Sequence, residues 1–195
     1  MEMIIDLPTK FNDSYEFFKA EILPREKRKN IYFKKKSYFL YIGIDDNCLG
    51  YNLAYLHLIK IEPKDAYVNY PCRLGKPIDD CDTQCDINSK NNIFNPVIYR
   101  SVQCIYRANH LTFLRRLLDI LETQDRTKVK EWYNYKIKRI FYRLEDSGID
   151  YIAIFELKGK KEQRHLTLIS AFPVFDATSK KIYDKQYLSF KDAII

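Results

Sequence analysis

The last third of the chain has three segments rich in apolar, β-branched and aromatic residues, separated by short polar stretches. The segments are Ile137–Glu145, Tyr151–Gly159 and Arg164–Val174, and this pattern is typical of strands. The turns between them are short, and turns of this length join antiparallel neighbours because a parallel crossover needs a dozen residues or more. The pattern therefore predicts an antiparallel meander.

A helical period precedes the meander. Leucines at 111, 114, 118 and 121 fall on one helical face, which predicts an amphipathic helix over Arg107–Glu122. This helix would cover the apolar face of the sheet. Nearer the start, Tyr15–Leu23 has helical character that Pro24 ends.

The remaining segments are less regular. Two extended pieces flank a turn at Lys34–Lys36, and the second predicts a strand over Tyr38–Ile44. The segment Asn47–Glu62 fits either a helix or a strand, and Ala177–Phe190 fits a short helix or a final edge strand. Between Pro63 and Pro96 the periodicity is lost, which predicts a long acidic insertion; loops of this length are uncommon in compact domains unless they have a function.

These elements predict an α+β fold. An antiparallel meander in the C-terminal half would be packed by one long amphipathic helix, with an N-terminal helix and hairpin before it. We expect a single domain over residues 1–195, with the helix and hairpin in 1–62, the acidic loop insertion in 63–98 and a basic helix-plus-sheet core in 99–195.

The charge of the chain indicates a polyanionic partner. The formal net charge is +7; residues 1–99 contain 14 Lys and Arg against 14 Asp and Glu, whereas residues 100–195 contain 19 against 12, so the whole excess lies in the second half. Aromatic residues are interspersed with basic ones in Lys130–Glu145, a combination that suits phosphates and unstacked bases. RNA, with tRNA as one candidate, is the expected partner; a solvated basic surface is the alternative.

The cysteines and the hydropathy suggest a cellular compartment. The chain has five cysteines, an odd number, no basic and apolar leader at its start, and no run of about 18 apolar residues. We therefore expect a reduced, cytoplasmic protein with no membrane partner. Cys72, Cys81 and Cys85 are spaced C-x8-C-x3-C, which is not the usual spacing of a zinc knuckle. We expect no metal and no cofactor, and keep a zinc-supported nucleic-acid binder that would also use Cys104 and His110 as an alternative.

Several side chains could take part in RNA chemistry. Metal-free cleavage requires a base for the 2′-hydroxyl, a cation for the developing charge and a donor that orients the phosphate. His57 interrupts an apolar segment, where it is either a hydrogen-bonded core residue or the border of a cleft. In an extended chain Ser170 shares a face with Leu166 and Leu168, so the hydroxyl would end a row of leucines. The basic residues around the turn before it are Lys158, Lys160, Lys161, Arg164 and His165.

The order of these segments resembles the phage-associated members of the barnase, EndoU, colicin and RelE-like nuclease superfamily. The segment "SAFPV" at Ser170–Val174 resembles the hydroxyl, Ala, aromatic, Pro sequence that ends their penultimate strand, and Tyr38–Glu62 resembles their N-terminal hairpin. On this resemblance, motif-like positions fall on His57, Arg107 or Arg115, and Ser170. The resemblance implies a metal-independent endoribonuclease that acts by 2′-hydroxyl attack, as a toxin or phage-conflict effector with a cognate inhibitor protein.

Two hypotheses follow. In the first, His57, Ser170 and Arg164 are catalytic, and Arg107, Arg115, Lys158, Lys160, Lys161 and His165 bind RNA. In the second, the chain is a non-catalytic phage or mobile-element protein that binds a host protein or nucleic acid, and its 16 tyrosines supply the interface. The first hypothesis requires His57 and Ser170 to face one positively charged hollow.

Overall fold

The structure is a computed structural model and describes residues 11–43, 47–48, 51–61, 102–123, 125–160, 163–174 and 177–194. Its helices are α1 (Asn12–Phe17), the π-helix η2 (Phe18–Ile22), the 3-10 helix η3 (Arg25–Lys27), α2 (Leu53–Ile59), α3 (Ile105–Asn109), α4 (Leu111–Glu122) and α5 (Ala177–Phe190). The expected insertion at 63–98 lies outside the described residues.

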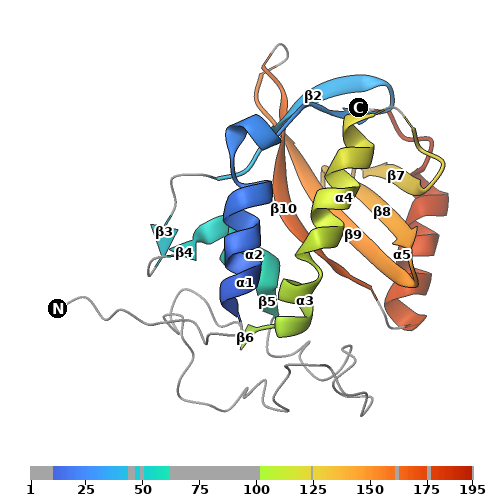
Figure 1. Cartoon of the computed structure of the whole chain (residues 1–195). Coiled ribbons are helices and arrows are strands. Elements are labelled where there is room, and N and C mark those ends of the chain that lie inside the picture. Colours follow the sequence, from blue (N-terminus) through green and yellow to red (C-terminus); the bar gives the residue numbers. More distant parts are fainter. Residues whose placement is uncertain are drawn as a thin grey trace.

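A six-stranded sheet with the order β1-β2-β10-β9-β8-β7 forms the centre of the molecule (Figure 1). Its strands are β1 (Ile31–Phe33), β2 (Lys36–Tyr41), β7 (Val129–Asn134), β8 (Arg139–Asp146), β9 (Ile149–Lys158) and β10 (His165–Pro173). Neighbours pair antiparallel except β2 and β10, which pair in parallel. Two short pairs lie apart from it: β3 (Asn47–Cys48) with β4 (Tyr51–Asn52), and β5 (Lys60–Ile61) with β6 (Val102–Gln103).

Tight turns fix the register of the hairpins. Ser147 and Gly148 both have positive φ between β8 and β9, as the two-residue hairpin turn with the favoured twist requires. Lys34 and Lys35, between β1 and β2, also have positive φ, a left-handed backbone conformation that residues other than glycine rarely adopt. Gly159 also has positive φ, and a Cβ there would lie 2.4 Å from a backbone oxygen, so the β9–β10 turn needs glycine at this position.

Each face of the sheet has its own hydrophobic core. The inner face packs against α1, α2, η2, α3 and α4, with the leucines of α4 fully buried against Tyr142 and Phe155. The outer face packs against α5 over β7, β8 and β9, where Trp132 stacks on Phe141 with ring centroids 5.0 Å apart. The β1–β2 hairpin curls across to β8, since the hydroxyl of Tyr142 donates to the carbonyl of Tyr32 at 3.0 Å. The sheet is therefore close to a barrel around the inner core.

The α+β class and the meander covered by an amphipathic helix are confirmed. The helix expected over Arg107–Glu122 is two helices, α3 and α4, which meet at His110. The imidazole of His110 hydrogen-bonds the carbonyl of Tyr106 at 2.7 Å, and its backbone N–H donates to the carbonyl of Arg107. Leu53–Ile59 and Ala177–Phe190, whose types the sequence left open, are helices. The parallel pairing of β2 with β10 was not expected.

Candidate functional site

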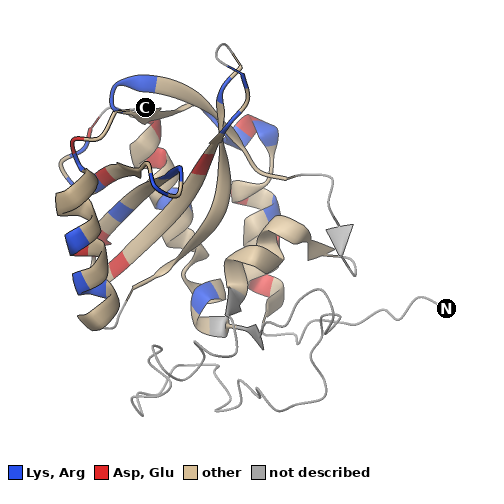
Figure 2. Cartoon of the chain, turned by 180° about the vertical axis from the view of Figure 1, so that it is seen from behind, with Lys and Arg blue, Asp and Glu red and all other residues tan. Residues whose placement is uncertain are grey.

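Part of the outer face of the sheet is not covered by α5. Figure 2 shows this face, with α5 against one side of it. α5 packs over β7, β8 and part of β9, where Ile152 and Ile154 are buried, whereas Glu156 and Lys158 nearer the end of β9 are 40% and 51% exposed. Outward-facing side chains can be assigned because paired residues share a face and neighbours along a strand alternate. We call the uncovered set the outer patch: Phe39 and Tyr41 from β2, His165, Thr167 and Ser170 from β10, Glu156 and Lys158 from β9, and Arg139 from β8.

Two aromatic rings in the outer patch are exposed. Tyr38, Leu40 and Ile42 are buried in the inner core, so the alternate residues Phe39 and Tyr41 point outward, and they are 37% and 40% exposed. The ring of Tyr41 lies 5.6 Å from the imidazole of His165, edge to face. Such rings offer stacking surfaces on a rigid strand.

Two cationic side chains lie on the same face as these rings, Lys158 on β9 and Arg139 on β8. Lys158 pairs with Glu156 at 3.4 Å, with both side chains well exposed. Arg139 forms no ion pair with any residue that the structure describes. It follows the exposed turn that contains Lys136 and Lys138. Exposed aromatic and cationic groups thus lie together on one face.

Ser170 faces the outer patch and not the inner core. The register between β9 and β10 shifts at Ile169, so Leu168 pairs with Phe155 of the inner core whereas Ser170 pairs with Ile154 of the outer core. The prediction that Ser170 shares a face with Leu166 and Leu168 is therefore wrong. The extra residue of the β-bulge reverses the alternation beyond it.

His57 belongs to the other side of the sheet. It lies on α2, whose neighbouring residues Tyr55, Leu56 and Leu58 are buried in the inner core. The imidazole is half-buried and has interaction partners. The helix of His57 and the side chain of Ser170 thus lie on opposite faces, and the geometry gives no support to their sharing one phosphate.

The basic residues near the β9–β10 turn are divided between the two faces. His165 and Lys158 are paired and belong to the outer patch. Arg164 is exposed but acts on the inner side: burial raises the pKa of the inner-core residue Tyr38, and the charge of Arg164 lowers it. Lys160 is exposed in the turn itself, and Lys161 lies outside the described residues.

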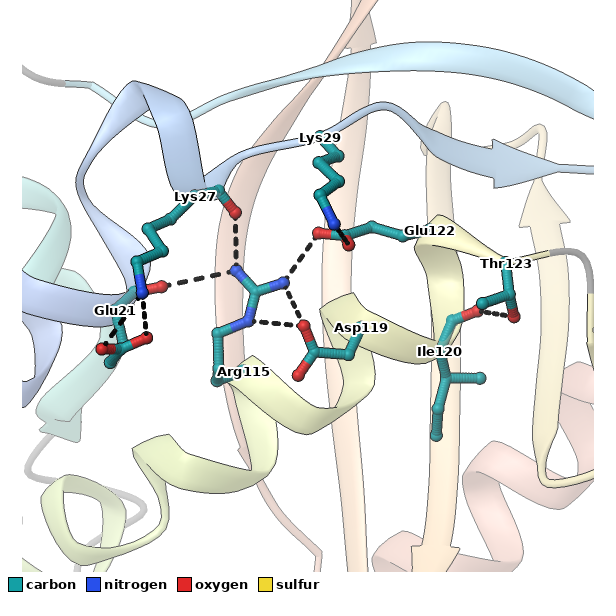
Figure 3. A network of polar contacts seen from close by, with 8 residues as sticks. All are labelled: Glu21, Lys27, Lys29, Arg115, Asp119, Ile120, Glu122 and Thr123. Atoms are coloured by element: carbon teal, nitrogen blue, oxygen red, sulfur yellow. Dashed lines mark hydrogen bonds and ion pairs between the residues drawn. The ribbon is translucent and has the colours of Figure 1, made fainter.

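Arg115 has a structural role. Its guanidinium donates to Asp119 at 2.6 Å, to Glu122 at 2.7 Å and to the carbonyl of Lys27 at 2.8 Å, which ties α4 to η3 (Figure 3). Burial lowers the pKa of Arg115, but the two carboxylates outweigh it and the pKa is raised. The predicted contact of Arg115 with RNA has no support from these contacts.

Arg107 reaches the edge of the outer face. It lies on α3, in the inner layer, and its guanidinium carbon is 4.5 Å from the ring centroid of Phe172 on β10. β2 covers β10 only from His165 to Thr167, so this contact lies beyond the end of the strand pairing. Arg107 has further interaction partners.

Apart from the outer patch, a polar hollow of about 500 Å³ lies where α5 meets the β8–β9 turn. Arg143 donates to both carboxylate oxygens of Asp150 at 2.7 Å and to Asp184 of α5 at 2.7 Å. Burial lowers the pKa of Arg143, but the two carboxylates raise it by more, so the net shift is upward. Because its charges are paired with one another, the hollow indicates a structural contact for α5 and no charged ligand.

Metal-ligating and membrane features were also considered. Within the described ranges no three His, Cys, Asp or Glu side chains are grouped as a metal would require, while Cys72, Cys81 and Cys85 lie outside them. Cys104 is buried and His110 bonds the carbonyl of Tyr106. None of the helices in the described part of the chain has the length and apolar character of a membrane span.

Comparisons with known proteins found no matching family model, no matching curated protein and no matching solved structure. The resemblance to the nuclease superfamily stays a prediction.

Sequence reasoning missed Phe39, Tyr41, Glu156 and Arg139 as site residues. Tyr38–Ile42 is apolar or aromatic at every position, so the sequence does not show which of its residues face the core, and the outward position of Phe39 and Tyr41 follows from the structure. The sequence does not reveal that this face continues into β10 and β9.

Proposed function

We propose that the protein binds single-stranded RNA across the outer patch. The observation that supports this most directly is the exposure of Phe39 and Tyr41 of β2 on the same face of the sheet as Arg139 of β8, a cation without an ion pair among the described residues. Single-stranded nucleic-acid sites combine stacking rings with cations that follow the backbone. The positive charge of the second half of the chain favours the same class of partner.

The spacing of the rings fits successive bases. Phe39 and Tyr41 are two positions apart on one strand, which is about 6.7 Å at the usual rise per residue. An extended single strand can place neighbouring unstacked bases at a similar separation, one on each ring. His165 lies beside Tyr41, and Lys158 pairs with His165 in register, so a cation lies on the same face two strands from the rings.

Ribonuclease activity with His57 as the base is not part of this proposal, because His57 and Ser170 lie on opposite faces. Roles as a toxin or phage-conflict effector and a cognate inhibitor stay predictions. A host protein that docks on the same rings is the competing function, and the binding experiment separates the two.

The test is fluorescence anisotropy with a labelled RNA of about 12 nucleotides. Phe39→Thr and Tyr41→Thr keep strand propensity, and each should weaken binding about 5- to 150-fold, because base–ring stacking contributes roughly 1–3 kcal/mol. Leu188→Thr, at a 68% exposed position of α5, is the matched control and should bind like the wild type. Affinity should fall steeply with salt; binding that depends on neither ring nor salt contradicts the proposal.

A further inference from the structure

Glu156 is an acidic side chain in a basic and aromatic surface. Register places it on β9 between Arg139 of β8 and Thr167 of β10, and the same row continues to Tyr41 of β2. It is the one carboxylate among the residues of the outer patch. A surface that bound only phosphates would gain nothing from it, because a carboxylate repels them.

The ion pair with Lys158 does not account for Glu156. That pair is 3.4 Å long with both side chains about half exposed, and exposed pairs of this kind contribute little to stability. Arg139, its partner in register, forms no ion pair with it. The hydroxyl of Thr167, on the other side of Glu156, is buried and has no hydrogen-bond partner within the described part of the chain. Of the two neighbours of Glu156 in register, Arg139 is therefore the one that offers a donor to a ligand.

We infer that Glu156 selects guanine in the bound RNA, an inference that rests on the proposed function. A carboxylate accepts two parallel hydrogen bonds, and guanine is the base whose Watson–Crick edge presents two adjacent donors, N1–H and N2–H. Adenine, cytosine and uracil present donors and acceptors in alternation or a single donor group. Bases of single-stranded RNA are read on this edge because it is not paired.

The neighbouring strand supplies the complementary donor. Guanine O6, an acceptor, lies next to N1, and Arg139 lies one strand away from Glu156, at the usual spacing of about 4.8 Å. A guanine edge placed across β8 and β9 meets a donor and then an acceptor pair, in the order that its own groups require. Neighbouring bases would stack on Tyr41 and Phe39, on the β2 side of the same patch.

The experiment uses four labelled RNAs of about 12 nucleotides: one of uridines alone, and three with a central G, A or inosine. The wild type should bind the G-containing RNA roughly tenfold more tightly than the A-containing one, as for a good bidentate contact. Inosine keeps N1–H and O6 but lacks the N2 amine, so its RNA should bind with intermediate affinity.

The Glu156→Gln variant separates hydrogen bonding to guanine from general repulsion of phosphates, because the two effects change RNA affinity in opposite directions. Loss of the negative charge should leave the uridine RNA bound as tightly or more tightly, whereas binding of the G-containing RNA should weaken about tenfold toward the others. Glu16→Gln is the matched control, because it removes the same charge from an exposed Glu–Lys pair on α1. It should preserve the preference for G.

The outcomes are distinct. Binding of all four RNAs with equal affinity, or a Glu156→Gln variant that strengthens binding of every RNA including the G-containing one, overturns the guanine inference and leaves the proposed function standing. Absence of binding to all four by the wild type overturns the proposed function itself.

Discussion

Asp150→Asn should destabilise the protein strongly although it removes a single charge. Arg143 is 3% exposed and its partner Asp150 is 6% exposed, and they form two hydrogen bonds of 2.7 Å. An arginine side chain stays charged at any pH of interest, and Asp184 still raises the pKa of Arg143 when Asp150 is neutralised. Breaking a buried pair costs about 3–5 kcal/mol. We expect the lower end, about 3 kcal/mol, because Asp184 still accepts from Arg143 at 2.7 Å.

Urea unfolding followed by tryptophan fluorescence measures this loss. Trp132 is the single tryptophan, and it is fully buried between the outer face and α5, close to the perturbed pair. A loss of about 3 kcal/mol corresponds to a fall of roughly 6–12 °C in Tm for a chain of this size. Asp184→Asn, at a position 50% exposed, is the control and should cost about 1 kcal/mol or less. An Asp150→Asn variant within 0.5 kcal/mol of the wild type (a threshold of about the effect of an ordinary surface substitution) would refute the reasoning.

Three further predictions follow from the contacts and charges. Arg115→Ala should lower the free energy of unfolding by about 2 kcal/mol, since charged hydrogen bonds to Glu122 and Lys27 are lost, and a binding titration should show unchanged RNA affinity. Arg139→Ala should reduce the slope of log affinity against log salt by about 0.7, the value for one phosphate contact on a single strand, whereas Lys19→Ala, on the inner layer, should leave the slope unchanged. Burial lowers the pKa of His110 more than its bond to Tyr106 raises it, so the unfolded chain takes up the proton more readily; stability should fall as pH drops below about 6.5, and His110→Gln should flatten urea midpoints measured across that range.

The sequence predicts local elements of this fold well because their signals are local. The leucine period identifies α4, and apolar, β-branched and aromatic runs separated by short turns identify the strands of the meander. Pro24 ends the first helical segment as expected, after the π-helix η2. The break at His110 is not visible in the hydrophobic pattern, because it comes from a hydrogen bond between the His110 side chain and the backbone carbonyl of Tyr106.

Long-range pairing is what the sequence does not contain. β2 and β10 are more than 120 positions apart and pair in parallel over three residues, His165 to Thr167. This pairing carries Phe39 and Tyr41 to the side of His165 and so assembles the outer patch. The low amphipathicity of Ala177–Phe190 likewise conceals that α5 packs on the outer face through Tyr183 and Tyr187.

The β-bulge at Ile169 shows why a motif reading of Ser170–Val174 can place chemistry on the wrong face. Without the extra residue, Ser170 would continue the row of Leu166 and Leu168 into the inner core, where a hydroxyl would need a hydrogen-bond partner. With it, Ala171 takes the inner position against Ala153 and the hydroxyl of Ser170 turns outward beside Ile154. The bulge gives up regular pairing at one residue and keeps the inner core apolar. Packing of the whole sheet determines which residues of β10 face the inner core. The face on which Ser170 lies therefore follows from tertiary packing and not from the spacing of the motif.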